Sequence, residues 1–300
     1  MVMKTFNFDV MIIGAGPSGL AAALYAKRAG LSVAVIEKNV VGGQLQLADR
    51  VDNYPGVASI SGVDLAVSML AQAENAGAEF FYGAPHALDL AASPKVIRLA
   101  AQTLTARFVI LAMGTSAKKL GLKEEESLVG SGVSYCATCD GMFFKGKDVM
   151  VVGGTQKAVQ EVAYLQPLVN KIYLVDKGAL DHLNLPHIEK IENAEVIELH
   201  GKPLQKVRLS LKSGTTREVA VSGLFCAMGA SPNTFGVTAQ ISLDEKGYIL
   251  TDATLKTSLD GVYATGDVRK GALKQIITAC ADGALAATEV IKQNNKYKLR

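Results

Sequence analysis

Two cysteines separated by two residues are the most reactive feature of this 300-residue sequence. Cys136 and Cys139 stand in the run Cys-Ala-Thr-Cys, and Asp140 follows directly. A pair with this spacing closes a small disulfide loop and favours redox chemistry. Disulfide exchange needs a thiolate as attacker and a protonated leaving thiol, so Asp140 is placed to relay protons.

Half of a zinc site is the alternative interpretation of the cysteine pair. Zinc needs two further Cys or His ligands. The remaining candidates form no second closely spaced pair beyond the weak one of His182 and His187; they are His86, His182, His187, His200, Cys226 and Cys280. Ligand count therefore favours a dithiol, and no metal site is expected. Cys226 and Cys280 are expected as inert core residues.

A glycine-rich turn is the second feature that indicates chemistry. An apolar strand over 10–13 leads into Gly-Ala-Gly-Pro-Ser-Gly at 14–19. Gly14 turns the chain tightly, Gly16 lets the backbone approach a pyrophosphate, and Gly19 lets the next helix pack on the strand. A helix over 20–29 and a strand over 31–36 follow, and Glu37 is then placed to accept hydrogen bonds from a ribose. The segment predicts a dinucleotide site.

The same unit recurs later, which indicates two nucleotide-type folds. Residues 149–158 match 10–19 position for position, and a strand over 171–175 ends on Asp176 in the register of Glu37. Similar glycine-containing ends at 112–115 and 227–230 mark the domain crossings. We therefore expect an α/β protein with two Rossmann-like, three-layer domains, the second inserted into the first. The first domain would comprise 1–116 and 241–300, and the inserted domain 117–240.

Composition narrows the classes of function. The chain is 49% hydrophobic and 20% charged, which suits a globular fold. Its formal net charge of +3 gives no electrostatic footprint for nucleic acid or an anionic membrane. Four cysteines are too few for a secreted disulfide framework, and no stretch reaches the roughly 18 apolar residues of a spanning helix. We expect a cytoplasmic protein without nucleic-acid or membrane partners.

Several motifs together resemble the low-molecular-weight thioredoxin reductase family over essentially the whole chain. They are the turn at 14–19, Gly-Gly-Gln-Leu at 42–45, Asn-Tyr-Pro-Gly at 53–56, the dithiol run at 136–141, Thr-Gly-Asp at 265–267 and Gln-Ile-Ile-Thr-Ala at 275–279. The resemblance implies FAD as cofactor, a thioredoxin or thioredoxin-like protein as partner, and a homodimer. It implies that Cys139 exchanges electrons with the flavin and that Cys136 attacks the partner's disulfide.

The resemblance also implies a set of FAD-binding residues. Glu37 would hold the adenosine ribose, Gln44 and Asn53 would lie near the flavin, and Asp267 would accept from a ribitol hydroxyl. The full set is Gly14, Gly16, Pro17, Ser18, Gly19, Glu37, Gly43, Gln44, Leu45, Asn53, Gly114, Gly266, Asp267, Gln275 and Ile276.

The second nucleotide unit departs from the family pattern at two positions. Thr155 stands where a glycine normally lets the backbone approach the pyrophosphate. Asp176, followed by Lys-Gly-Ala-Leu at 177–180, replaces an arginine-bearing stretch that would bind a 2′-phosphate. Three hypotheses follow: a flavin disulfide reductase fed by ferredoxin, which we favour; a reductase using NADH or NADPH; and a non-catalytic flavin-binding redox sensor, against which the dithiol argues.

Overall fold

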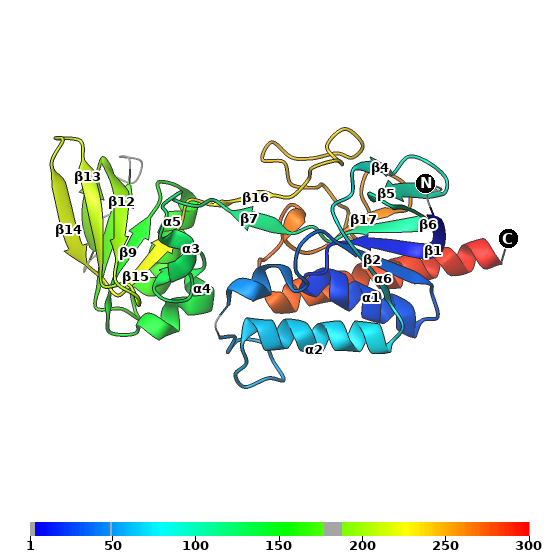
Figure 1. Cartoon of the computed structure of the whole chain (residues 1–300), viewed down its shortest axis with the longest axis horizontal. Helices are drawn as coiled ribbons and strands as arrows, with labels where there is room; N and C mark the ends of the chain where they lie inside the picture. The colour runs from blue at the N-terminus through cyan, green and yellow to red at the C-terminus, as the bar shows by residue number, and fades with distance from the viewer. Residues whose placement is uncertain (1–3, 49, 177–187, 300) are drawn as a thin grey trace. The chain divides into compact units, whose positions relative to one another are not determined.

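The computed structural model describes residues 4–48, 50–176 and 188–299, and the chain divides into two compact units. Unit 1 comprises Met1–Ser116 and Ser231–Arg300, and unit 2 comprises Ala117–Ala230. The connecting segments pair as two short strands, β7 (Thr115–Ala117) and β16 (Ala230–Pro232) (Figure 1). The predicted insertion of one domain into the other is confirmed.

The second part of unit 1 begins earlier than the expected residue 241. The chain returns to unit 1 at Ser231, directly after the glycine-containing segment 227–230 that the sequence marked as the crossing. The reason is the packing of the intervening residues: Val237 is fully buried in a core cluster of unit 1, and the Asn233 side chain donates to the Met113 carbonyl at 3.0 Å. These anchors fix residues 231–240 to unit 1.

A seven-stranded sheet forms the centre of unit 1, with the order β3-β2-β1-β6-β5-β4 and β17 paired to β6. The parallel strands are β1 (Lys4–Ile13), β2 (Val33–Glu37), β3 (Glu79–Tyr82), β6 (Gln102–Leu111) and β17 (Val262–Ala264). The strands β4 (Ala87–Asp89) and β5 (Lys95–Arg98) are antiparallel. The last four residues of β1, 10–13, are buried, as a parallel strand covered on both faces requires.

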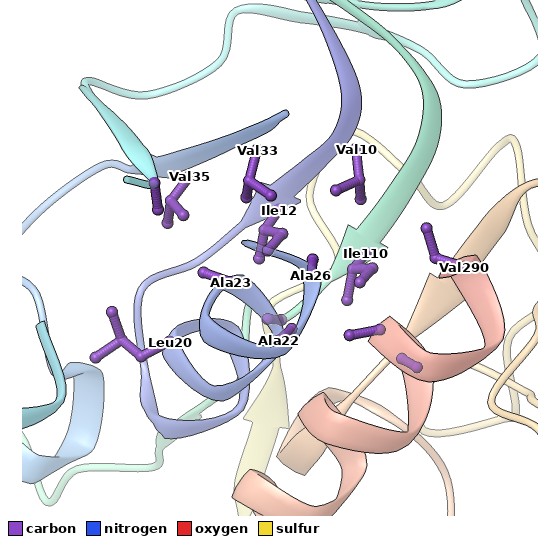
Figure 2. Packing of buried hydrophobic residues seen from close by; sticks show 14 of the residues in the cluster. Val10, Ile12, Leu20, Ala22, Ala23, Ala26, Val33, Val35, Ile110 and Val290 are labelled. Carbon is purple, nitrogen blue, oxygen red and sulfur yellow. The ribbon is translucent and has the colours of Figure 1, made fainter. Parts of the chain in front are cut away.

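Helices of unit 1 pack on this sheet through small side chains. Ala22, Ala23 and Ala26 of α1 (Pro17–Arg28) lie against the sheet and α6 (Ile276–Lys298), as Figure 2 shows. The remaining helical elements are α2 (Gly62–Asn75) and the 3-10 turns η1 (Gly43–Leu47) and η3 (Gly266–Val268).

Unit 2 has a smaller parallel sheet with the order β11-β10-β9-β15-β8. Its strands are β8 (Val133–Ser134), β9 (Asp148–Val152), β10 (Lys171–Asp176), β11 (Ile188–Glu192) and β15 (Gly223–Cys226), and its helical elements are α3 (Glu125–Leu128), α4 (Ala137–Asp140), η2 (Gly141–Phe144) and α5 (Gln156–Leu165). A three-stranded antiparallel sheet adds β12 (Ala194–His200), β13 (Lys206–Leu211) and β14 (Thr216–Ala220). Its Val207 and Leu209 share a core cluster with Met150 and Leu224.

The predicted fold class is therefore confirmed: both units are α/β with Rossmann-like parallel sheets. Within the residues that the structure describes, no helix is long and apolar enough to cross a bilayer.

Candidate functional site

The glycine-rich turn of unit 1 joins β1 to α1. At two of its glycines, a side chain would collide with the backbone even without a ligand. A Cβ on Gly14, whose φ is +104°, would lie 2.4 Å from the Ala112 carbonyl oxygen. A Cβ on Gly19 would lie 1.9 Å from the Gly14 carbonyl oxygen. No atom lies within 4 Å of a Cβ built on Gly16, so its outward face is open. Such a face at a helix N-terminus suits a pyrophosphate.

Glu37 ends β2 beside this turn and is buried. One carboxylate oxygen accepts from the Ala15 N–H at 2.8 Å, and the other accepts from the Asn39 N–H at 2.8 Å. Glu37 therefore ties the strand end to the glycine turn. Each oxygen retains a second lone pair, so the predicted contact with a ribose stays open as a prediction.

Pro17 and Ser18 begin α1 and meet the segment that contains Gly266. Pro17 occupies the first helical turn, where its missing N–H costs nothing. Ser18 is buried, and a Cβ on Gly266, whose φ is +68°, would lie 2.9 Å from the Ser18 hydroxyl oxygen. The Gly266 N–H donates to Asp282 at 3.0 Å.

Asp282 was not found from the sequence. It lies in α6, is buried, and takes two hydrogen bonds from the Arg269 guanidinium at 2.6 and 2.9 Å. This paired arrangement fixes the loop that presents Asp267. An acidic helix residue that pairs with an arginine thirteen residues earlier forms no recognisable sequence motif, so only the fold reveals it.

Asp267 shows the strongest fit to a ligand. Burial raises the pKa of its carboxyl, against the opposing charge of Lys274 and with a smaller contribution from Asp282. Among the described residues, none donates a hydrogen bond to this carboxylate. A partly buried acceptor without a protein donor fits a hydroxyl-rich ligand segment such as ribitol.

The other predicted cofactor residues continue the same region of unit 1. A Cβ on Gly43 would lie 3.5 Å from the Gly16 Cα. The Gln44 side chain donates to the backbone and hydroxyl oxygens of Thr115, both at 3.0 Å. The Asn53 side chain donates to that of Gln275 at 3.2 Å. These contacts place segments far apart in sequence around one turn.

The three remaining positions of the predicted set are less informative by themselves. Leu45 is buried in a small cluster against which Ile276 packs. Gly114 has a φ of +62°, and its carbonyl accepts from the Asn233 N–H at 3.0 Å. All the FAD-binding residues expected from the sequence thus belong to unit 1.

The dithiol lies in unit 2 as a disulfide. Cys136 and Cys139 are joined, with their Cα atoms 5.3 Å apart. Cys136 is the N-cap residue of α4 and is partly buried, whereas Cys139 is exposed. Cys139 is thus the more exposed residue of the pair, whereas the resemblance assigns the attack on the partner's disulfide to Cys136.

Asp140 is held close to the disulfide by Ser134. The Ser134 hydroxyl donates to the Asp140 carboxylate at 2.6 Å and accepts from the Cys136 N–H at 3.1 Å. One side chain therefore links the predicted proton relay to the first cysteine. The sequence analysis did not predict a role for Ser134. Its position two residues before Cys136 was the only signal for such a role.

Two side chains of α5 hold the same turn and were also missed. The Glu161 carboxylate accepts from the Ala137 N–H, and the Lys157 ammonium donates to the Tyr135 carbonyl at 3.1 Å. Burial raises the pKa of the Glu161 carboxyl, the Ala137 N–H and Lys157 oppose this, and Asp140 adds to it. The i,i+4 spacing of Lys157 and Glu161 was the signal that could have found them.

The second glycine-rich turn repeats the geometry of the first with one difference. A Cβ on Gly153 would lie 2.5 Å from the Ala227 carbonyl oxygen. In the first turn, a Cβ on Gly14 would lie 2.4 Å from the Ala112 carbonyl oxygen. Thr155 takes the place of Gly16, is exposed and begins α5 without a side-chain capping bond. Asp176 ends β10 and is buried. The stretch 177–180 lies outside the described residues.

Metal binding was the alternative interpretation of the cysteines. His182 and His187 lie outside the described residues. Elsewhere in the described chain, no three Cys, His, Asp or Glu side chains gather in a way that could hold a metal ion. Burial raises the pKa of the Cys226 thiol and of the Cys280 thiol.

Comparisons with known proteins agree with this arrangement. A family model described as "Pyridine nucleotide-disulphide oxidoreductase" matches residues 8–283. A thioredoxin reductase from Listeria innocua is 40% identical, with 97% of this chain and 95% of that protein covered. The thioredoxin reductase structure from Streptococcus pyogenes superposes with a TM-score of 0.92 at 36% identity, covering 97% of this chain and 99% of that one.

A second kind of solved relative is also similar. A structure titled as a ferredoxin-flavin thioredoxin reductase from Clostridium acetobutylicum has a TM-score of 0.55 at 30% identity, covering 97% of this chain and 99% of that one. The fold and dithiol thus define a disulfide oxidoreductase of the pyridine nucleotide class. Within that class, the chain belongs to the low-molecular-weight thioredoxin reductase family. The family is FAD-dependent, and the protein is a FAD-dependent disulfide oxidoreductase.

Proposed function

We propose that this enzyme reduces the disulfide of a thioredoxin or thioredoxin-like protein and that reduced ferredoxin, not NADPH, supplies the electrons. The observation that carries the proposal is a contrast between the two units. The first glycine-rich turn has an open face at Gly16, whereas the equivalent position of the second turn holds the Thr155 side chain. FAD binding and the dithiol are thus supported, while the nicotinamide site is altered.

The chain's own residues define how FAD would be held. Gly16 and the N-terminus of α1 would receive the pyrophosphate, Glu37 the ribose and Asp267 a ribitol hydroxyl. Gln44, Asn53 and the Gln275-Ile276 segment would line the flavin. Bound FAD supplies the electron pair that reduces the Cys136–Cys139 disulfide.

The dithiol then passes this pair to the partner. The Cys136 thiolate attacks one sulfur of the partner's disulfide, breaking that bond and forming a mixed disulfide. Cys139 attacks the Cys136 sulfur of the mixed disulfide, which restores the Cys136–Cys139 bond and releases the partner as a dithiol. Asp140, held by Ser134, exchanges protons with the departing and attacking sulfurs.

Three features of unit 2 support ferredoxin as the donor. Thr155 begins α5 with a side chain at the position where Gly16 of the first turn has none. The Lys157 cation in the first turn of α5 is engaged by Tyr135 and Glu161. The Asp176 carboxylate would repel a 2′-phosphate. The solved ferredoxin-flavin thioredoxin reductase from Clostridium acetobutylicum shows that this chain's relatives include such an enzyme.

A nicotinamide-dependent reductase is the second candidate, and Asp176 is the observation that favours it. It ends β10 as Glu37 ends β2, so it could accept from the 2′-hydroxyl of NADH. Anaerobic mixing of the purified enzyme with NADPH, NADH or reduced ferredoxin, followed by flavin absorbance, separates the candidates. We expect rapid bleaching by ferredoxin; rapid stoichiometric bleaching by micromolar NADPH would contradict the proposal.

We also propose a homodimer that acts in the cytoplasm. Unit 1 carries exposed apolar side chains at Val40, Val67 and Tyr82, which line a pocket of about 310 Å³ beside α2. Exposed apolar groups of this kind favour association. A cycling dithiol suits a reducing compartment. Light scattering of the purified protein tests the dimer, and a monomer at micromolar concentration would contradict it.

A further inference from the structure

The dithiol turn is held by a pair of charged side chains on α5. Glu161 accepts from the Ala137 N–H, and its other carboxylate oxygen lies 4.0 Å from the Lys157 ammonium. The Glu161 side chain is 12% exposed, against 33% for Lys157. Lys157 in turn binds the Tyr135 carbonyl. The residues on both sides of Cys136 are therefore fixed by one face of one helix.

We propose that Glu161 is a positioning residue of the dithiol: it fixes the turn through Ala137 and its negative charge favours the protonated thiol of Cys136. The inference rests on the proposed function, in which this pair exchanges with a partner's disulfide. It adds a second carboxyl group to the site, beside Asp140.

The position of Cys136 explains why this carboxylate matters. The Ala137 N–H, directly after Cys136, donates to the Glu161 carboxylate. The Glu161 charge therefore lies beside the turn in which the thiolate would form. A negative charge at this place disfavours the Cys136 thiolate relative to the thiol.

The charged groups that act on Glu161 are Lys157 on its own helix and Asp140 on α4. The strands β9 and β10, which pack under α5, contribute apolar side chains to this core, such as Val151 and Leu174. Burial raises the pKa of the Glu161 carboxyl. The Ala137 N–H and Lys157 counteract that rise and favour the anion.

The consequence concerns where a proton resides after reduction. Breaking the Cys136–Cys139 bond takes two electrons from the reduced flavin and one proton from solvent, giving one thiol and one thiolate. The Glu161 charge places the proton on Cys136 and leaves Cys139 as the thiolate. Asp140 then removes the Cys136 proton when the partner's disulfide is attacked.

The test measures thiol reactivity directly, without donor or partner. The holoenzyme is reduced with dithiothreitol, freed of reductant anaerobically and alkylated with iodoacetamide across pH, and the Cys136 peptide is quantified by mass spectrometry. Glu161→Gln keeps an acceptor for the Ala137 N–H but removes the charge. We expect its alkylation midpoint about one pH unit below wild type, which is about a tenfold faster reaction at lower pH.

Two further variants make the result specific. Lys157→Met removes the opposing cation and should move the Cys136 alkylation midpoint upward, opposite to the shift in Glu161→Gln. A merely loosened turn would not move the two midpoints in opposite directions. Gln160→Glu adds a carboxylate at the neighbouring exposed position and should leave the midpoint unchanged. The same midpoint for Glu161→Gln and wild type overturns the inference. Shifts of Glu161→Gln and Lys157→Met in the same direction also overturn it. If Glu161→Gln does not fold, the absence of an upward shift in Lys157→Met overturns it.

This assay also separates the inference from the proposed function. A protein that fails to reduce thioredoxin but shows the opposite midpoint shifts retains the role of Glu161. A protein that reduces thioredoxin with unshifted midpoints retains the function and loses the role.

Discussion

At the scale of single residues, the proposed FAD site depends on the glycines of the first turn and on Asp267. Gly14 and Gly19 face backbone atoms, so their replacement disturbs the protein whether or not a ligand binds. Gly16 faces open space, and Asp267 presents a carboxylate that no described residue satisfies. These two positions therefore report on the cofactor more than on the fold.

Gly16→Val should abolish FAD retention while the protein still folds, because the added side chain enters the space in which a pyrophosphate would lie. Thr155→Val, at the equivalent position of unit 2, is the matched control and should keep full flavin content. Absorbance of the purified proteins and circular dichroism measure both properties. A Gly16→Val protein with full flavin content would show that the site is assigned wrongly.

Asp267→Asn should weaken FAD binding about tenfold, because a hydroxyl would lose a charged acceptor. The same change should stabilise the FAD-free protein at pH 7. Burial raises the pKa of the Asp267 carboxyl in the folded protein. The contribution of Asp267 to the free energy of unfolding is therefore fully present below the unfolded pKa of about 3.9, and it is lost as pH rises through the raised folded pKa.

The melting temperatures of FAD-free wild type and Asp267→Asn should accordingly differ at pH 7 and converge toward pH 4. Thermal unfolding followed by circular dichroism measures the difference, and flavin fluorescence titration measures affinity. Unchanged affinity together with identical melting temperatures would remove Asp267 from the site.

At the scale of elements, the packing of α1 on α6 positions the first turn. Gly283 of α6 lies so close to α1 that an added Cβ would meet the Ser18 carbonyl oxygen at 2.1 Å. A Gly→Ala change in a helix ordinarily stabilises by about 1 kcal/mol. Here the clash should reverse the sign.

Gly283→Ala should therefore lower the free energy of unfolding by about 2 kcal/mol and weaken FAD retention, since α1 must shift. Ala281→Val, on the exposed face of the same helix, is the control and should change stability by less than about 0.5 kcal/mol. Urea unfolding measures both. A Gly283→Ala protein as stable as wild type would contradict the packing described.

The elements also show what the sequence could predict. The repeated strand-turn-helix units were predicted because buried parallel strands and glycine turns leave a local signature, as at Gly14 and Gly153. The contacts of Glu161 with Ala137 and of Asp282 with Gly266 were not, because they join separate segments without any motif. The crossing at 227–230 was marked by its glycine, but the start of the second part of unit 1 was placed too late, because burial of Val237 joins residues 231–240 to unit 1.

On the scale of the whole molecule, the proposed function assigns FAD binding to unit 1 and disulfide exchange to unit 2. Unit 1 has the intact dinucleotide turn and unit 2 the disulfide. The donor proposal predicts that Thr155→Gly combined with Asp176→Arg gains NADPH binding, since the first change frees backbone and the second supplies a cation. Isothermal titration with NADPH measures the gain. Tight NADPH binding by wild type, unchanged in the double variant, would contradict the proposal.

The most direct test of the account is transfer of electrons from flavin to a thioredoxin disulfide through the dithiol. The holoenzyme is reduced anaerobically with dithionite to the end point of flavin bleaching, so no natural donor is needed, and oxidised thioredoxin is added in excess. We expect flavin absorbance to return as thioredoxin thiols appear, two thiols per flavin reoxidised, and neither event in Cys136→Ser or Cys139→Ser. Reoxidation at wild-type rate in both cysteine variants, or wild-type flavin that stays reduced, would contradict the account.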